Sequence, residues 1–209
     1  MNADQIASLT TAGGTLVLAI ATFGATRSAN RASRVAERSL LTGLRPVLMH
    51  AQLQDPEQKV GFVDQHWVHL EGPGAAVEEE AGVVYLAIAL RNVGNGIAVL
   101  QGWSPSPRRL TTDAPGPVAE FRPQTRDIYV PAGGLGFWQG AFRDQADPLH
   151  GDFARAARER EPVTIDLLYS DMHGGQRTIT RFAVIPGAES SWVATVGRHW
   201  MVDGGGPRG

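Results

Sequence analysis

A run without any charged residue, from Ile6 to Thr26, constrains this chain more than any other feature. As an α-helix, these 21 residues would be about 31 Å long, which matches the roughly 30 Å hydrocarbon core of a bilayer. Threonines interrupt the apolar side chains, but membrane helices tolerate Thr because its hydroxyl can bond the helix backbone. We therefore expect residues 1–26 to form a short flank and one transmembrane helix. The alternative is a buried N-terminal helix of a soluble domain.

The charges that flank this run distinguish an anchor from a secretory signal. Asp4 precedes the run, and arginines follow it. A signal peptide would have basic residues before the apolar run and a small-residue cleavage site after it. We expect the segment to be retained.

A basic stripe follows the run in residues 27–45. Its arginines are spaced by four, three and four positions, which places them on one face of a helix: Arg27, Arg31, Arg34 and Arg38. Arg45 and Pro46 should end that helix. Anionic lipid headgroups attract such a stripe by about 1 kcal/mol per residue, and arginines normally stay on the cytoplasmic side. The stripe therefore predicts a single-pass protein of the inner (plasma) membrane, with its N-terminus outside and its domain in the cytosol. The alternative is a solvated helix face without a role at the membrane.

Charge and composition limit what the remaining residues can do. Residues 27–45 carry a formal charge of +4, so residues from 46 onward carry −5 within the net charge of −2. An acidic domain is not expected to bind nucleic acid, because neutralising phosphates requires a basic face. Cys is absent, which excludes disulfides and Cys-ligated zinc.

Residues 46–203 are typical of a chain of short strands separated by Gly- and Pro-containing turns. The strand-like segments are Val47–Leu53, Val60–Leu70, Val83–Arg91, Ile97–Trp103, Arg126–Val130, Gly136–Phe142, Val163–Tyr169, Arg177–Ile185 and Trp192–Trp200. Gly151–Glu161 has the pattern of a helix, and Glu78–Glu80 that of a solvated loop. We expect an all-β domain, a single antiparallel sandwich with one short helix, followed by a disordered tail over residues 204–209.

Two segments resemble known families. Leu90–Ala98, with the sequence LRNVGNGIA, resembles a strand-turn element of bacterial Ig-like sandwich domains. Tyr169–Gly175, followed by Arg177–Phe182, is similar to a Y-x-D-x-x-G hairpin of uncharacterised bacterial single-span membrane proteins. The resemblance implies an Ig-like β-sandwich and assigns no activity. The first segment predicts a structural turn of Asn92, Gly94, Asn95 and Gly96, in which both glycines adopt positive φ.

Pairs of carboxylate and imidazole side chains are the strongest candidates for chemistry. Asp64 and His66 would share one face of the predicted strand Val60–Leu70, while His69 would point to the other. One carboxylate and one imidazole are too few to bind a metal ion. Asp171 and His173 lie in a Gly-rich turn, where Asp commonly bonds the backbone. We therefore predict no catalytic residues, no metal site and no cofactor.

The tryptophans and one long loop are the remaining candidates for a binding role. The tryptophans lie in or beside predicted strands, where core packing is the default: Trp67, Trp103, Trp138, Trp192 and Trp200. The Pro-rich loop Ser104–Thr125 suits either a binding role or disorder.

The predicted function is a membrane-tethered, non-enzymatic interaction module. Its partners would be the bilayer, with its anionic lipids, and a protein whose identity the sequence does not give. The alternative is an enzyme or a small-ligand binder that uses the Asp/His-bearing strands and the tryptophans. Convergence of Asp64, His66, Asp171 and His173 in one pocket would favour that alternative.

Overall fold

The computed structural model describes residues 22–37, 39–40 and 43–203. The chain divides into two compact units, Met1–Gly43 and Leu44–Gly209. In the first unit, residues 22–37 and 39–40 are helical, and their side chains are exposed. Within the described residues, no helix combines the length and the apolar character that crossing a bilayer requires. Residues 6–21 of the predicted span, Arg38 and the predicted tail 204–209 lie outside the described residues.

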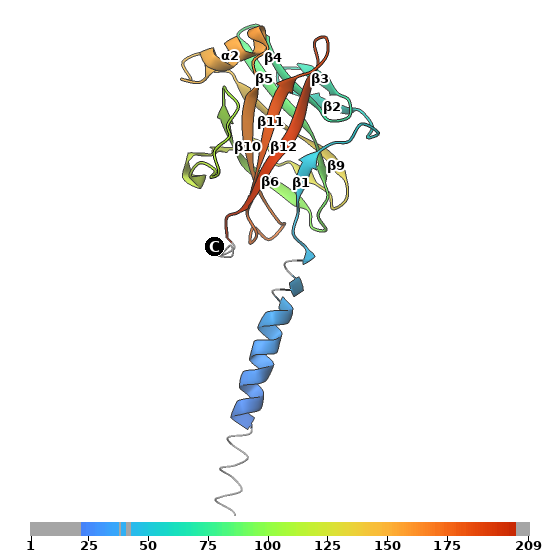
Figure 1. Ribbon diagram of the computed structural model, residues 1–209, viewed down its shortest axis with the longest axis vertical. Coiled ribbons are helices and arrows are strands. Elements are labelled where there is room, and N and C mark those ends of the chain that lie inside the picture. The colour runs from blue at the N-terminus through green and yellow to red at the C-terminus, as the bar shows by residue number, and fades with distance from the viewer. Residues whose placement is uncertain (1–21, 38, 41–42, 204–209) are drawn as a thin grey trace, which may run out of the picture. The chain divides into compact units, whose positions relative to one another are not determined.

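The second unit consists mostly of antiparallel β-strands (Figure 1), which confirms the predicted β-rich class. Its strands are β1 (Leu48–His50), β2 (Gln58–Gly61), β3 (Trp67–Leu70), β4 (Gly74–Glu80), β5 (Val83–Asn92), β6 (Ala98–Ser106), β7 (Arg122–Pro123), β8 (Tyr129–Val130), β9 (Leu135–Phe142), β10 (Val163–Ser170), β11 (Thr178–Pro186) and β12 (Trp192–Met201). A 3₁₀ turn, η1 (Val118–Glu120), precedes β7. Ten strands form one sheet in the order β1-β5-β4-β12-β11-β10-β6-β7, with β8 beside β6 and β9 beside β5. The hairpin β2–β3 forms a separate sheet.

The large sheet curves around the main apolar core. Trp103 on β6 and Trp138 on β9 belong to strands far apart in the sheet order, yet their ring centroids are 5.3 Å apart. Gln124 joins the same two regions, because its amide oxygen accepts from Trp138 Nε1 at 3.1 Å and its amide nitrogen donates to the carbonyl oxygen of Gln139 at 3.0 Å. The two ends of the sheet therefore meet across the core.

Strand β5 is covered on both faces. Its even-numbered residues 84–90 belong to the main core, while residues 85, 87 and 89 belong to a second apolar cluster with Val60, Val68 and Leu70 of the hairpin. A strand buried on both faces has a nearly continuous apolar sequence, as β5 does. The hairpin β2–β3 thus forms an apolar cover over the outer face of β5.

Strand β10 is also fully buried, but its outer face is polar. Thr164 Oγ1 accepts from the backbone nitrogen of Leu110 at 2.9 Å. Arg181 of β11 donates to both oxygens of Asp166 at 2.7 Å and to the carbonyl oxygen of Thr112 at 3.0 Å. Part of the Pro-rich loop is therefore held against the sheet by hydrogen bonds.

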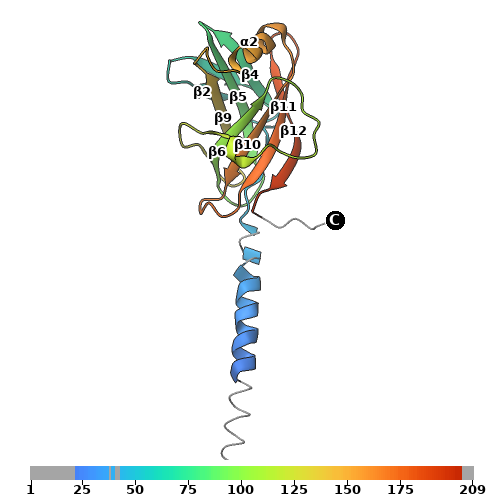
Figure 2. The same cartoon turned by 90° about the vertical axis from the view of Figure 1, so that its left-hand side faces the viewer.

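The helix α2 (His150–Glu159) lies at one end of the strands of the domain (Figures 1 and 2). Phe153 is fully buried and stacks on Phe142 of β9 with a centroid distance of 4.8 Å. Arg160 ends the helix in the left-handed conformation, with φ of 54°. The predicted segment Gly151–Glu161 thus corresponds to α2.

Two predicted elements were wrong. Val60–Leu70 is the hairpin β2–β3, because residues 62–66 turn the chain back without the Gly or Pro that usually mark a turn. Glu78–Glu80 is the end of strand β4, which pairs with Val83–Tyr85 of β5. These glutamates are exposed although their strand is paired. A run of charged residues does not predict a strand, so the sequence did not reveal β4.

Candidate functional site

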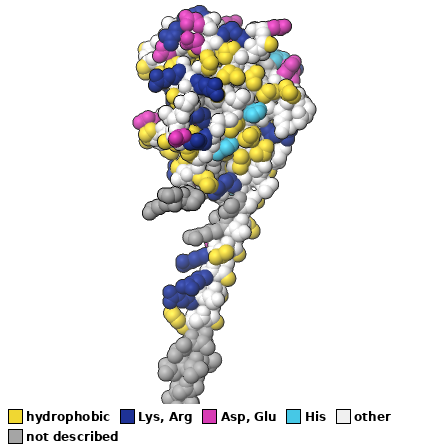
Figure 3. Space-filling model, viewed as in Figure 1, with side chains coloured by type: hydrophobic (Ala, Val, Ile, Leu, Met, Phe, Trp, Pro, Cys, Tyr) yellow, Lys and Arg dark blue, Asp and Glu magenta, His cyan; other side chains and the backbone are white. Residues whose placement is uncertain are grey.

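The two ends of the domain differ in charge. The distal end carries α2 and is formed by the turns 62–66, 81–82 and 187–191 with residues 143–162. His150 Nε2 lies 2.9 Å from the carbonyl oxygen of Gly82, and Arg160 donates to that of Gly187 at 3.1 Å, which joins these segments. Acidic side chains gather there (Figure 3): Asp64, Glu78, Glu79, Glu80, Asp144, Asp147, Asp152, Glu159, Glu161 and Glu189. The arginines of this end are Arg143, Arg155, Arg158, Arg160 and Arg122, which is bonded to Asp147 at 2.6 Å.

The basal end lies at the other end of the strands. It is formed by residues 44–47, 93–97, 131–134, 171–177 and 201–203. Its carboxylates are occupied, since Asp203 bonds Arg177 at 2.6 Å and Asp171 accepts from two backbone nitrogens of its own turn at 3.0 Å. The exposed apolar residues there are Leu44, Val93, Ile97, Met172 and Met201.

Tyr85 is the centre of a cluster of side chains at the distal end. It projects from the outer face of β5, and its hydroxyl donates to Asp64 Oδ2 at 2.8 Å. Arg143 donates to the same oxygen at 3.2 Å. The imidazole of His66 stacks on the Tyr85 ring with a centroid distance of 3.9 Å and an interplanar angle of 14°. Asp64 and His66 thus contact the same tyrosine from one turn.

Two glutamates of β4 flank His66. Glu78 and Glu80 are two residues apart in a strand, so both point to the outer face, and Glu78 lies directly opposite Tyr85. Glu78 Oε2 is 3.1 Å from Nε2 of His66, and Glu80 Oε2 is 2.8 Å from Nδ1. Both ring nitrogens of His66 therefore face a carboxylate of β4.

Trp67 forms the rim of a shallow pocket beside this cluster. The pocket has a volume of about 550 Å³ and is lined by Asp64, Gln65, His66, Trp67, Glu80, Ala81, Val83 and Tyr85. Trp67 is 61% exposed, the highest value among the tryptophans. Its ring lies over Gly61 of the paired strand, where a Cβ atom would approach the indole to 2.9 Å. The missing side chain of Gly61 therefore lets the indole lie flat on the hairpin.

Two residues of the pocket adopt the left-handed conformation without being glycine. Gln65 has φ of 63° and Ala81 has φ of 50°. Ala81 and Gly82 both have positive φ, as the central residues of a type I′ hairpin turn require. The conformation costs an L-residue about 1–2 kcal/mol. Such strain often occurs at binding sites.

Two groups of the cluster have shifted pKa values. Burial tends to raise the pKa of Asp64, but the Tyr85 hydroxyl and Arg143 outweigh it and hold this pKa below its usual value. Burial and the contact with Asp64 raise the pKa of Tyr85. A general acid or base works best with a pKa near neutrality, and both groups are shifted away from it.

The pair Asp64–His66 and the pair Asp171–His173 lie at different ends of the domain and do not form one pocket. Asp64 and His66 lie in the distal turn of the hairpin and not on one strand face as predicted. Asp171 and His173 lie at the basal end, where Asp171 bonds the backbone nitrogens of its own turn. His69 is on β3 and contacts Glu57 at 2.6 Å. In the part of the chain that the structure describes, no group of three or more His, Asp or Glu side chains could hold a metal ion.

The tryptophans divide into buried and accessible ones. Trp103, Trp138 and Trp192 are buried, in agreement with the prediction of core packing. Trp200 is partly buried, and its Nε1 donates to the carbonyl oxygen of Asp113 at 3.0 Å. For Trp67 the prediction was wrong, because its indole packs on Gly61 on the face of the hairpin that points away from β5.

The predicted structural turn lies at the basal end and centres on Asn92. Its side-chain oxygen accepts from the backbone nitrogens of Val47 at 3.1 Å and Gly94 at 3.0 Å. Its side-chain nitrogen donates to the carbonyl oxygens of Gly96 at 2.7 Å and Val130 at 3.1 Å. All four hydrogen-bonding positions of this fully buried amide are used.

The prediction of positive φ at Gly94 and Gly96 was wrong, since neither adopts it. Both are required for close approach instead. A Cβ atom on Gly94 would lie 2.2 Å from the carbonyl oxygen of Arg45, and one on Gly96 would lie 1.7 Å from that of Leu44. Asn95 is exposed between them.

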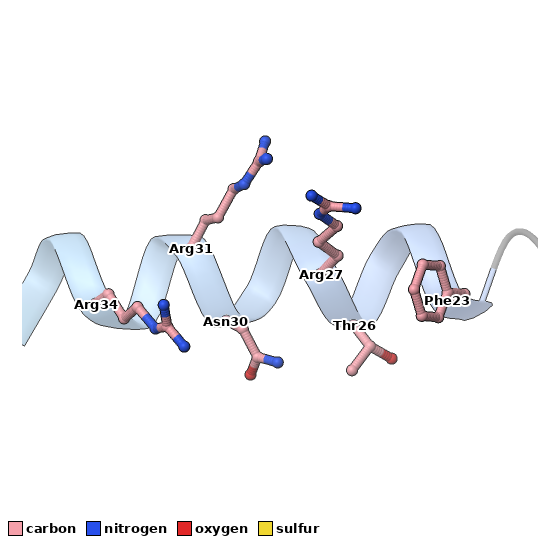
Figure 4. A pocket seen from close by; sticks show the side chains of 6 residues that line it. All are labelled: Phe23, Thr26, Arg27, Asn30, Arg31 and Arg34. Atoms are coloured by element: carbon pink, nitrogen blue, oxygen red, sulfur yellow. The ribbon is translucent and has the colours of Figure 1, made fainter.

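Three arginines of the predicted basic stripe, Arg27, Arg31 and Arg34, lie on the described helix of the first unit. Figure 4 shows Phe23, Thr26, Arg27, Asn30, Arg31 and Arg34 along the helix, with Arg27 and Arg31 pointing to the same side. At 100° per residue, Arg27, Arg31 and Arg34 fall within about 60° of the helix circumference. All three side chains are exposed, so a basic face is available on this helix.

Sequence reasoning missed Tyr85, Arg143, Glu78 and Glu80 as members of the distal cluster. Tyr85 and Asp64 are 21 residues apart, and Arg143 and Asp64 are 79 apart, so no local pattern connects them. The turn pair Ala81-Gly82 directly before the apolar segment Val83–Arg91 is the signal that could have revealed β4 as the other strand of a hairpin. Comparisons of the chain with family models, with curated proteins and with solved structures find no match.

Proposed function

We propose that this protein is a membrane-tethered interaction module that binds a protein partner through the distal end of its domain. The observation that carries the proposal is the exposed Trp67 beside a pocket of about 550 Å³. Tryptophan is enriched among the residues that dominate binding energy at protein interfaces. The pocket lining includes the carboxylates of Asp64 and Glu80 and two strained backbone positions, Gln65 and Ala81.

The tether is supported by the sequence of residues 1–45. The uncharged run Ile6–Thr26 has the length of a membrane span, and the arginines that follow it predict an N-terminus outside and a domain in the cytosol. A reporter pair fused after Gly209, one fluorescent only in the cytosol and one active only when exported, tests this placement. Activity of the exported reporter alone would refute it.

The finer fold assignment is also a proposal. We infer an Ig-like sandwich from the resemblance of LRNVGNGIA to the strand-turn element of such domains. The four hydrogen bonds of Asn92 supply a physical reason for an asparagine at that position.

The alternative of an enzyme receives less support. The pKa values of Asp64 and Tyr85 are shifted away from neutrality, and the pairs Asp64–His66 and Asp171–His173 lie at opposite ends of the domain.

Photocrosslinking in intact cells tests the binding surface. A photoreactive amino acid replaces Val63 in the distal turn or, as the matched control, Met172 in a basal turn; these side chains are 82% and 64% exposed. We expect a specific crosslinked protein from position 63, lost in the Trp67→Ala variant, and none from position 172. Identical products from both positions, or none from position 63, would refute binding through the distal end.

A further inference from the structure

Strand β4 has a neighbouring strand on one side only over most of its length. It pairs with β5 from Ala75 to Glu80, but with β12 only at Gly74 and Ala75. Strand β12 begins at Trp192, and residues 187–191 before it form the turn that joins it to β11. The sheet therefore has a slot between the last part of β4 and this turn.

The backbone groups of β4 that face the slot follow from the geometry of the hairpin. A two-residue turn joins β4 to β5, so Glu80 and Val83 make the first hydrogen-bonded pair. Such pairs alternate along antiparallel strands, which directs the N–H and C=O groups of Val77 and Glu79 away from β5. Among the described residues, these four groups have no hydrogen-bonding partner. Val77 is only 2% exposed, so its two groups also have little access to water.

The slot has room for an extended segment. Its volume is about 560 Å³, and it is lined by residues 77–80 of β4, by Ala157 of α2 and by Ser190 of the turn, among others. Arg160, which ends α2, donates to two carbonyl oxygens of the turn at 3.0 and 3.1 Å. These bonds hold the turn in place, so the two sides of the slot stay apart.

Helix α2 covers a face of β4 and not its edge. Val77 and Glu79 point to the same face of the strand, and Val77 belongs to the main core. On this face Arg158 of α2 donates to Glu79 Oε2 at 2.6 Å. The edge that carries the unpaired backbone groups is therefore left to the slot.

Charge limits which strand can occupy the slot. Glu78, Glu79 and Glu80 make this part of β4 acidic, although His66 and Arg158 contact them. A second copy that added its own β4 would bring the same glutamates opposite each other, and like charges destabilise a strand pair. A segment with basic side chains is favoured instead.

We propose that a basic, extended segment of a partner protein binds in the slot as an additional strand beside β4. Its backbone completes the hydrogen bonds of Val77 and Glu79, in the mode by which exposed sheet edges bind peptides. This inference deepens the proposed function and rests on it, because it names how the distal end holds its partner.

Amide hydrogen exchange of the ¹⁵N-labelled full chain in detergent micelles tests the proposal. The probe is a short peptide of alternating lysine and valine, and a glutamate–valine peptide of equal length is the control. An added strand bonds every second residue of β4, so the lysine peptide should slow exchange at Val77 and Glu79 by about tenfold or more. Exchange at Glu78 and Glu80 should not change, and the glutamate peptide should have no effect. No slowing, or equal slowing at all four residues, would overturn strand addition.

Two substitutions at one position separate the backbone from the charge. Glu79→Pro removes the N–H group that faces the slot and keeps the bonds between β4 and β5, whereas Glu79→Ala removes the same carboxylate and keeps the N–H group. The slowing at Val77 should be lost in the first variant and kept in the second, and equal results in both would also overturn the proposal. If the proline variant does not fold, the exchange pattern of the wild type decides. If position 63 still crosslinks a partner in cells, the proposed function survives a negative result.

Discussion

The basal and distal ends of the domain differ in how well their polar groups and backbone are stabilised. At the basal end, the amide of Asn92 uses all its hydrogen-bonding positions, and both carboxylates have partners. At the distal end, Gln65 and Ala81 hold an unfavourable backbone conformation, and Trp67 is left in solvent. The basal end is therefore optimised for stability, where the chain joins the first unit. The distal end retains strained backbone positions and an exposed tryptophan, and we propose that these features serve binding.

Removing the Asn92 side chain should give the largest effect and would test the basal half of this comparison. In Asn92→Ala, two backbone nitrogens and two carbonyl oxygens lose their partner in a buried place. We expect the free energy of unfolding of residues 44–209 to fall by roughly 3 kcal/mol or more, measured by urea denaturation. The control Asn95→Ala, at an exposed position of the same turn, should change it by less than about 0.5 kcal/mol. Similar values for both variants would mean that the amide network does not stabilise the basal end.

Adding a methyl group to Gly96 should give the next largest effect. The new Cβ atom would lie 1.7 Å from the carbonyl oxygen of Leu44, so the backbone must move. We expect Gly96→Ala to lose about 1–3 kcal/mol in the same denaturation experiment. Gly175→Ala is the matched control, since its Cβ atom would meet no atom within 4 Å. An unaffected Gly96→Ala variant would show that residues 44–46 do not pack tightly on the turn.

The pH dependence of stability should reveal a histidine on the basal side that is hydrogen-bonded in the folded chain. His199 Nδ1 lies 2.8 Å from Thr180 Oγ1, which is 2.9 Å from the Tyr169 hydroxyl, and this hydroxyl accepts from the backbone nitrogen of Leu48 at 3.1 Å. Partial burial lowers the pKa of His199 below its ordinary value of about 6.5. Below pH 6.5 the unfolded chain therefore binds a proton that the folded chain still resists.

Stability contributed by His199 should be complete above pH 6.5 and decline as the pH falls toward its folded pKa. Thermal unfolding of the wild type and His199→Gln across pH 5 to 8 checks this, because Gln cannot titrate. We expect the difference between the two melting temperatures to shrink as the pH falls. A constant difference would mean that this histidine does not titrate differently in the two states.

Relieving strain at the distal end should give the smallest effect, with the opposite sign. Ala81→Gly removes a left-handed L-residue, a gain that the greater flexibility of unfolded glycine partly offsets. We expect a stabilisation of up to about 0.5 kcal/mol. The control Ala132→Gly, in an exposed basal loop, should be slightly destabilising. Loss of stability in both variants would contradict the assignment of strain to the distal turn.

The sequence was informative where local patterns determine the structure. The β-rich class and most strands followed from apolar runs between turns, and β5 was recognisable because both its faces are buried. The positions of Gly94 and Gly96 were identified, but the physical reason was wrong, since close approach to Leu44 and Arg45 cannot be seen from the turn itself.

The distal site depends on contacts that no local pattern contains. Residues 62–66 turn the chain without Gly or Pro, so the hairpin looked like one strand and placed Asp64 and His66 on a strand face. The carboxylates of β4 looked like a solvated loop because charge dominates that segment. Trp67 looked like a core residue because the space over Gly61 arises only when β2 and β3 pair.

The proposed function depends on the membrane tether. The most direct test of this tether is alkaline carbonate extraction of membranes from cells that produce the full chain. Carbonate removes proteins held by charge alone, including those bound through a basic stripe, but leaves spanning helices in the bilayer. We expect the full chain to stay in the membrane pellet and a chain starting at Leu44 to be found in the supernatant. Quantitative release of the full chain into the supernatant would contradict a membrane-tethered module.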